Sequence, residues 1–138
     1  MRHIKYIIIH CSDSPDNMDI GVAEIRRWHK EKGWADVGYH FIIKRNGEVQ
    51  NGRDVEIVGS HCQGYNSYSI GICLVGGRYN SGKNNIDDIS HYTPEQIMSL
   101  KQLVFNLKEK YPEAEIKAHR DFNASKTCPN FNIKLLEV

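Results

Sequence analysis

The stretch AHRDFNASKTCPNF, residues 118 to 131, sets His119, Lys126 and Cys128 close together, while His10 lies far away at the end of an apolar run. Two imidazoles and one thiolate, with a fourth position left open for water, are a suitable first shell for catalytic zinc. Each residue also has a structural explanation, because a histidine at a strand end commonly makes a hydrogen bond and a single cysteine is commonly just packed. The residue types predict a metal site if the fold brings them together.

Both histidines end predicted strands. Residues 4 to 10, IKYIIIH, form a β-branched apolar run of strand length, and residues 114 to 119, AEIKAH, form a last short strand. Ligands collect beyond the carboxyl ends of strands in open α/β sheets, so His10 and His119 can face one crevice if these strands are parallel neighbours. Cys128 can fold back to the same place on its irregular loop. Cys11 points to the other side of its strand from His10, so only one of the two can serve the site.

Two amphipathic helices are expected between the strands. The first runs from about 21 to 32 and ends at Gly33, with apolar residues at intervals of three. The second runs from 94 to about 110, and Thr93 and Gln96 form a capping box at its start. Each helix has one apolar face, so each should pack against the central sheet.

The remaining strands form a hairpin and a central apolar segment. The hairpin turns at Asn46 and Gly47, a dipeptide that favours a type I′ turn, and residues 68 to 77, YSIGICLVGG, form another apolar strand. Residues 80 to 92 read as an exposed loop without chemistry. Strands interleaved with two helices predict an α/β fold, a sandwich with a central mixed β-sheet flanked by helices, in one domain spanning residues 1–138.

Composition excludes several classes of function. Eighteen basic and seventeen acidic residues give a net charge of +1, which argues against binding to a nucleic-acid backbone. The apolar run near the amino terminus is too short for a secretory signal, and no segment is long enough to span a membrane. We therefore expect a protein made in the cytoplasm without membrane insertion. Free thiols are expected for the four cysteines, because they lack C-x-x-C spacing and an export signal.

Four segments together carry a resemblance to a known family: IIIHCSDS, IRRWHKEKGWADVGYHFIIKRNGEV, GSHCQGYNSYSIGICLVGG and AHRDFNASKTCPNF. In this order, from about Ile7 to Leu135, the chain resembles the zinc-dependent N-acetylmuramoyl-L-alanine amidases of the phage-lysozyme type, which are relatives of the animal peptidoglycan recognition proteins. The resemblance implies the fold of that family and a single catalytic amidase domain. It also implies hydrolysis of the amide between the lactyl group of N-acetylmuramic acid and L-alanine in bacterial peptidoglycan.

The resemblance also implies roles for individual residues. The implied zinc ligands are His10, His119 and Cys128. The implied further catalytic residues are Tyr39 and Lys126, and the implied substrate-groove residues are His61 and Asn66. The H-E-x-x-H arrangement that supplies a glutamate base in many metalloproteases is absent, so the general base is unassigned. Structural or surface roles are expected for His3, His29, His40, His91, Trp28 and Trp34.

Three functions are compatible with this sequence. The first is a peptidoglycan amidase, which would act as a monomer on the cell wall as a phage or prophage lysis enzyme, released by a separate membrane lesion. The second is a module that binds peptidoglycan without cutting it, and the third is a related zinc peptidase that cuts within the stem peptide. Because binding modules of this family commonly lack the zinc cysteine, Cys128 favours an enzyme.

Overall fold

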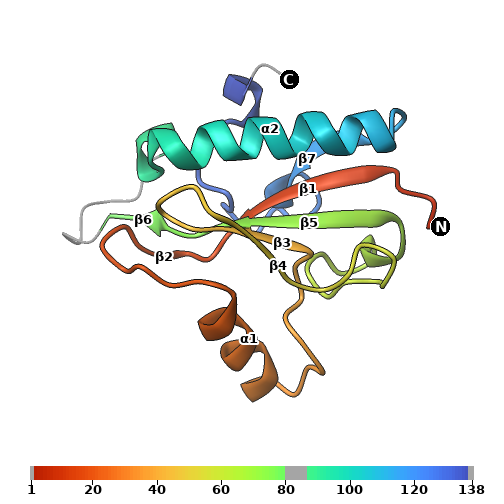
Figure 1. Ribbon diagram of the computed structural model, residues 1–138, viewed down its shortest axis with the longest axis horizontal. Helices are drawn as coiled ribbons and strands as arrows, with labels where there is room; N and C mark the ends of the chain where they lie inside the picture. The colour runs from red at the N-terminus through yellow and green to blue at the C-terminus, as the bar shows by residue number, and fades with distance from the viewer. Residues whose placement is uncertain (1, 80–86, 137–138) are drawn as a thin grey trace.

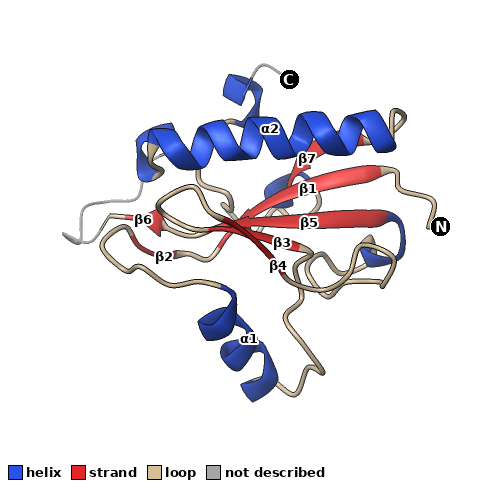
Figure 2. Ribbon diagram, viewed as in Figure 1, coloured by secondary structure: helices blue, strands red, loops and turns tan. Residues whose placement is uncertain are grey.

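The structure is a computed structural model in which residues 2–79 and 87–136 are described, and a five-stranded mixed sheet forms its centre (Figure 1). The strands are β1 (Tyr6–Cys11), β2 (Ser14–Pro15), β3 (Phe41–Ile43), β4 (Val49–Asn51), β5 (Ser69–Leu74), β6 (Gly77–Arg78) and β7 (Glu115–Ala118). The helices are α1 (Val22–Glu31) and α2 (Pro94–Lys110), with short 3-10 helices at Asn66–Tyr68, Ile89–His91, His119–Asp121 and Ile133–Leu136. The expected mixed sheet flanked by helices is confirmed, and Figure 2 shows α2 and α1 on different sides of it.

The sheet order is β4-β3-β5-β1-β7, in which only the β3–β4 pair is antiparallel. β5 is buried along its whole length and β1 along all but its first residue, as apolar runs in central parallel strands usually are. On β1, Ile7 and Ile9 join the larger core, which includes Leu100 and Val104 of α2. Strand alternation turns His10 to the opposite face of the sheet, away from α2. That face carries the candidate site.

The start of α2 follows the predicted capping box. The Thr93 hydroxyl accepts a hydrogen bond from the Gln96 N–H at 3.1 Å, and the Gln96 side chain accepts one from the Thr93 N–H at 3.1 Å. The Gln96 amide also donates to the carbonyl oxygens of Ile43 and Val75, so it ties the helix to the sheet. α1 ends as expected before Gly33, which has φ 91°, a conformation that glycine adopts without strain.

The predicted hairpin is confirmed by the antiparallel pairing of β3 with β4, but the predicted type I′ turn between them is wrong. That turn needs positive φ at both central residues, but only Gly47 of the pair has it, at 90°. The loop is longer, since the Lys44 N–H donates to the Glu48 carbonyl and the Gly47 N–H donates to the Lys44 carbonyl. Its tip binds the beginning of α2, where the Thr93 hydroxyl donates to the Arg45 carbonyl at 2.6 Å. The loop therefore has tertiary contacts that the dipeptide preference does not take into account.

Other predicted boundaries shift by a few residues. The apolar segment 68–77 splits after Leu74, because the chain leaves the sheet and pairs β6 with β2 instead. The predicted exposed loop is wrong at its last two residues, His91 and Tyr92, which are buried, while residues 87–90 are exposed or partly buried and residues 80–86 lie outside the described part of the chain. The Tyr92 hydroxyl donates to the Pro129 carbonyl at 2.6 Å. The segment therefore supports the loop that carries Cys128.

Neither helix in the described part of the chain has the length and apolar character needed to cross a membrane.

Candidate metal centre

The predicted meeting of the two histidines follows from strand register. β1 and β7 are parallel neighbours in which Ile9 pairs with Ala118, so His10 and His119 are the next residues on each chain. Their Nδ1 atoms lie 3.1 Å apart. His10 is 1% exposed, whereas His119 is only partly buried and reaches the open groove. His119 stands one residue beyond β7, at the start of a 3-10 helix, rather than inside the strand.

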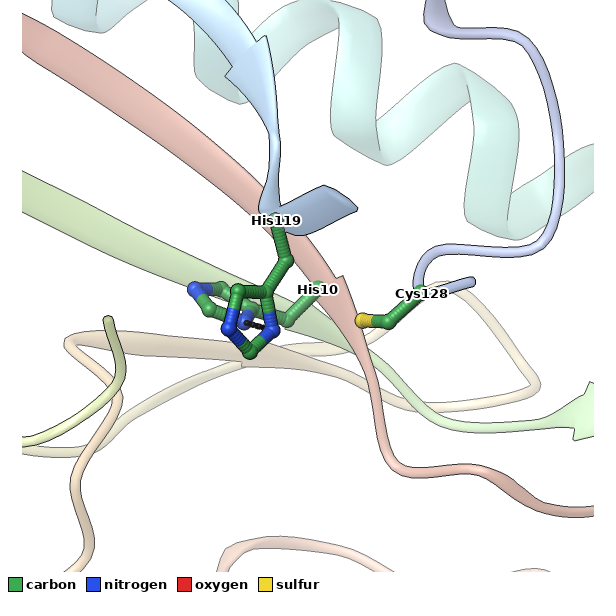
Figure 3. A group of neighbouring side chains, drawn as sticks. All are labelled: His10, His119 and Cys128. Atoms are coloured by element: carbon green, nitrogen blue, oxygen red, sulfur yellow. Dashed lines mark hydrogen bonds between the residues drawn. The ribbon is translucent and has the colours of Figure 1, made fainter. Parts of the chain in front are cut away.

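Cys128 completes the cluster from a loop that is well anchored. Figure 3 shows its side chain directed towards the two imidazoles, and one ligand atom from each of the three residues lies within 4.8 Å of the others. The Arg120 N–H donates to the Cys128 carbonyl at 3.1 Å, and the Arg120 guanidinium pairs with Asp87 at 2.6 and 2.7 Å. The Cys11 backbone N–H donates to the Cys128 sulfur at 2.9 Å. Backbone and side-chain contacts therefore hold the sulfur in place.

Burial keeps both imidazoles in the neutral form. Desolvation, followed by the neighbouring His61 and His119, lowers the pKa of His10 well below its ordinary value. Desolvation, followed by the charge of Lys126, also lowers the pKa of His119. The side-chain hydrogen bond with the Cys11 thiol, followed by burial, raises the pKa of the Cys128 thiol well above its ordinary value, although the Cys11 backbone N–H acts in the opposite direction. The thiol therefore keeps its proton until a bound cation replaces it.

These donors fit a zinc ion. Zinc takes nitrogen and sulfur ligands, and two nitrogen ligands of a tetrahedral zinc stand about 3.3 Å apart when each bond is about 2.05 Å. The separation of 3.1 Å between the His10 and His119 nitrogens is close to that value. Three protein ligands beside an open groove also match the pattern of catalytic rather than structural zinc. No acidic residue belongs to this cluster in the described part of the chain.

A groove of about 460 Å³ opens above the cluster and contains both predicted catalytic residues. The Tyr39 ring lies 5.1 Å from the His10 ring between centroids. Burial raises the pKa of Tyr39 well above its ordinary value, so its hydroxyl remains a hydrogen-bond donor. Lys126 is exposed on the groove wall, and its ammonium has no carboxylate partner among residues 2–79 and 87–136. Its positive charge therefore faces the groove uncompensated.

The two predicted substrate-groove residues also line this groove, but they make contacts inside the protein. His61 is 8% exposed, and its Nδ1 lies 2.8 Å from Nε2 of His10. The Asn66 side-chain oxygen accepts hydrogen bonds from the N–H groups of His61 and Cys62, both at 2.9 Å. Asn66 therefore closes the turn that presents His61 to His10.

Two residues that line the groove, Trp34 and Lys32, were not predicted from the sequence. Trp34, expected to be a packing residue, is 37% exposed on the groove wall and stacks edge-on against His29 with centroids 4.5 Å apart. Lys32 lies beside it, with its ammonium 5.4 Å from the Trp34 ring centre. Both residues flank Gly33, where α1 ends, and this position is the feature of the sequence that could have indicated them. The structural roles expected for His29 and His40 agree with their hydrogen bonds to backbone groups of Gly38, Gly71 and Ile57.

Comparisons with known proteins agree with this geometry. The family model described as N-acetylmuramoyl-L-alanine amidase matches residues 1–131. The endolysin of Klebsiella phage KP32 is 52% identical over 133 residues, which cover 96% of this chain and 85% of the endolysin. Among solved structures, the endolysin N-acetylmuramoyl-L-alanine amidase LysCS from Clostridium intestinale matches with a TM-score of 0.81 and 30% identity, over 99% of this chain and 82% of that protein. A mutant of Drosophila PGRP-LB in complex with tracheal cytotoxin matches with a TM-score of 0.76 and 25% identity, over 94% of this chain and 76% of that protein.

Proposed function

This chain belongs to the N-acetylmuramoyl-L-alanine amidase family, and from that premise we propose that it is a zinc-dependent peptidoglycan hydrolase. The bond cut is the amide between the lactyl group of N-acetylmuramic acid and L-alanine. The observation that carries the proposal is the convergence of His10, His119 and Cys128 at a groove that also contains Tyr39 and Lys126. These residue types can hold a catalytic zinc ion and stabilise the charge that develops during amide hydrolysis.

An unactivated amide needs a strong nucleophile and relief of the charge that develops on its carbonyl oxygen. When bound by His10, His119 and Cys128, zinc supplies Lewis acidity and a water of lowered pKa at neutral pH. One thiolate among the ligands cancels part of the positive charge of the ion, so a second cation has a clear use. Lys126 provides that cation from the groove wall, where no described carboxylate neutralises it.

Tyr39 provides a neutral donor from the lining of the groove, beside the His10 ring. Its hydroxyl stays protonated at all physiological pH values because burial raises its pKa. Two roles are open to it: it donates a hydrogen bond to the developing oxyanion, or it helps to move the proton of the attacking water. In both roles the hydroxyl, rather than the ring, is the part of Tyr39 that the reaction needs.

The substrate is bacterial peptidoglycan, and the relatives are phage endolysins, so the protein acts on the cell wall as a phage or prophage lysis enzyme. We also propose that residues 1–138 form one catalytic domain that works as a monomer without membrane insertion or nucleic-acid binding. Light scattering at micromolar concentration measures the oligomeric state. A stable dimer would contradict that part of the proposal.

A non-catalytic binding module is less well supported, because Cys128 is present in the histidine cluster and Tyr39 and Lys126 line the groove beside it. A peptidase that cuts within the stem peptide would share these residues. Products distinguish the three functions.

The test is mass spectrometry of muropeptides after purified peptidoglycan is digested with the zinc-loaded protein. We expect stem peptides with free L-alanine amino termini and glycans with intact lactyl groups. Products that retain L-alanine on muramic acid would assign a peptidase, and no products beside retained binding would assign a recognition module. Protein treated with a chelator and then reloaded with zinc is the control for metal dependence.

A further inference from the structure

His61 lies in the groove wall, but its imidazole also contacts the candidate zinc ligand His10. A role in binding substrate does not explain this contact. Nε2 of His10 lies 2.8 Å from Nδ1 of His61, and the rings meet edge to face with centroids 4.9 Å apart. On its other side, Nε2 of His61 lies 3.3 Å from the Ser69 hydroxyl, which belongs to a fully buried residue. Both ring nitrogens of His61 therefore have partners inside the protein, and neither is left for a substrate.

The fold makes room for this contact at a cost to the sheet. Gly71 lies in the middle of the buried strand β5, where glycine weakens a strand. A Cβ atom at Gly71 would stand 2.6 Å from Cγ of His61, so the missing side chain gives the imidazole its place against the sheet. The Asn66 side chain fixes the other end of His61 by accepting its backbone N–H at 2.9 Å. Strand and turn together hold one ring orientation.

From this geometry we propose that His61 is a positioning residue that fixes the tautomer and orientation of His10 for zinc binding. The inference rests on the zinc site proposed above. For Nδ1 of His10 to offer its lone pair to the ion, the His10 proton must be on Nε2, where it is donated to Nδ1 of His61. The His61 proton is then on Nε2 and is donated to the Ser69 hydroxyl. Ligand histidines usually gain orientation from such a partner, whose loss typically costs about 10- to 100-fold in metal affinity or activity.

The first experiment measures zinc affinity by competition with a chromophoric chelator in two matched variants. His61→Leu keeps a branched side chain of similar width but cannot accept a hydrogen bond. His61→Asn places an amide oxygen where Nδ1 stands. We expect a loss of about 10- to 100-fold in zinc affinity for the leucine variant and recovery of most of it in the asparagine variant.

His29→Leu is the control for the loss of a buried groove histidine, because the His29 imidazole contacts Gly38, Trp34 and Tyr39 rather than a zinc ligand. Its zinc affinity should equal that of the wild type. Equal affinity in His61→Leu and wild type would overturn the inference. A raised KM with unchanged zinc affinity in His61→Leu would also overturn it and would assign His61 to substrate contact. If the wild type bound no zinc, the proposed function itself would fail instead.

The second experiment uses only the wild-type protein, so it does not depend on whether a variant folds. Long-range nitrogen–proton correlation spectra of the zinc-loaded wild type report which nitrogen of each imidazole carries the proton. We expect the proton on Nε2 in both His10 and His61. A proton on Nδ1 of His61 in the zinc-loaded protein would contradict the proposed chain of hydrogen bonds.

Discussion

Replacing Lys126 by alanine should slow peptidoglycan hydrolysis without loss of zinc or of stability. Lys126 is exposed on the groove wall, so the substitution leaves no cavity and should change the free energy of unfolding by less than about 0.5 kcal/mol. A cation 4 Å from an oxyanion contributes about 4 kcal/mol at the effective dielectric constant of about 20 that suits protein surfaces. Loss of one oxyanion donor typically costs about 10²- to 10³-fold in kcat, or about 2.7–4 kcal/mol, so the two magnitudes agree.

The assay is release of soluble muropeptides under saturating substrate, with zinc content measured on the same samples. Because the cation is needed mainly when charge develops, kcat should fall while KM changes little. Lys126→Arg keeps the charge and should retain more activity than the alanine variant. Lys30→Ala removes an exposed lysine of α1 outside the groove and controls for the change in net charge. Turnover of the zinc-bound Lys126→Ala protein within a few-fold of wild type would refute the assigned role.

Four further outcomes are expected. Tyr39→Phe should keep zinc and lose about 10²- to 10³-fold in kcat, since only the hydroxyl donor is removed; unchanged turnover would exclude that donor. Cys128→Ser should lose zinc and activity together, because a ligand is replaced by a much weaker one; a fully zinc-loaded, active serine variant would contradict the ligand assignment. Chelation should leave the circular dichroism spectrum folded, because two apolar clusters of strand and helix side chains pack without a metal, and zinc should raise the melting temperature because it binds the folded chain; a random-coil spectrum without zinc would contradict this expectation. Burial lowers the pKa of His40 from 6.5 to about 4, so between these pH values the unfolded chain binds more protons than the folded chain. The free energy of unfolding of the zinc-free protein should therefore fall as pH drops from 6.5 to about 4. Urea titrations should show a weaker pH dependence of this free energy for His40→Gln than for the wild type, and the same dependence in both proteins would show that His40 is not its source.

The sequence predicted the parts of the site that depend on strand direction. An apolar run ending in His10 and another ending near His119 meet because parallel neighbouring strands end at one edge of a sheet, here with Ile9 beside Ala118. The two helices were also predictable, because a repeated apolar face and the Thr93 capping box are local signals.

Contacts between distant loops and strands could not be predicted in the same way. The bond from the Cys11 N–H to the Cys128 sulfur and the contact between His61 and His10 each depend on how two remote segments pack. The turn at Gly47 was predicted wrongly for the same reason, since its loop binds the start of α2 rather than following the preference of its own dipeptide. Gly71 carried a signal in hindsight, because a glycine inside a buried strand marks a close approach by another group.

The central claim is that His10, His119 and Cys128 hold the zinc ion on which hydrolysis depends. Anomalous diffraction from crystals of the zinc-loaded protein, recorded on both sides of the zinc absorption edge, locates the ion directly. We expect one strong peak within about 2.0–2.1 Å of a nitrogen of each histidine and about 2.3 Å from the Cys128 sulfur. A peak elsewhere in the molecule, or these three side chains pointing apart without an ion between them, would contradict the claim.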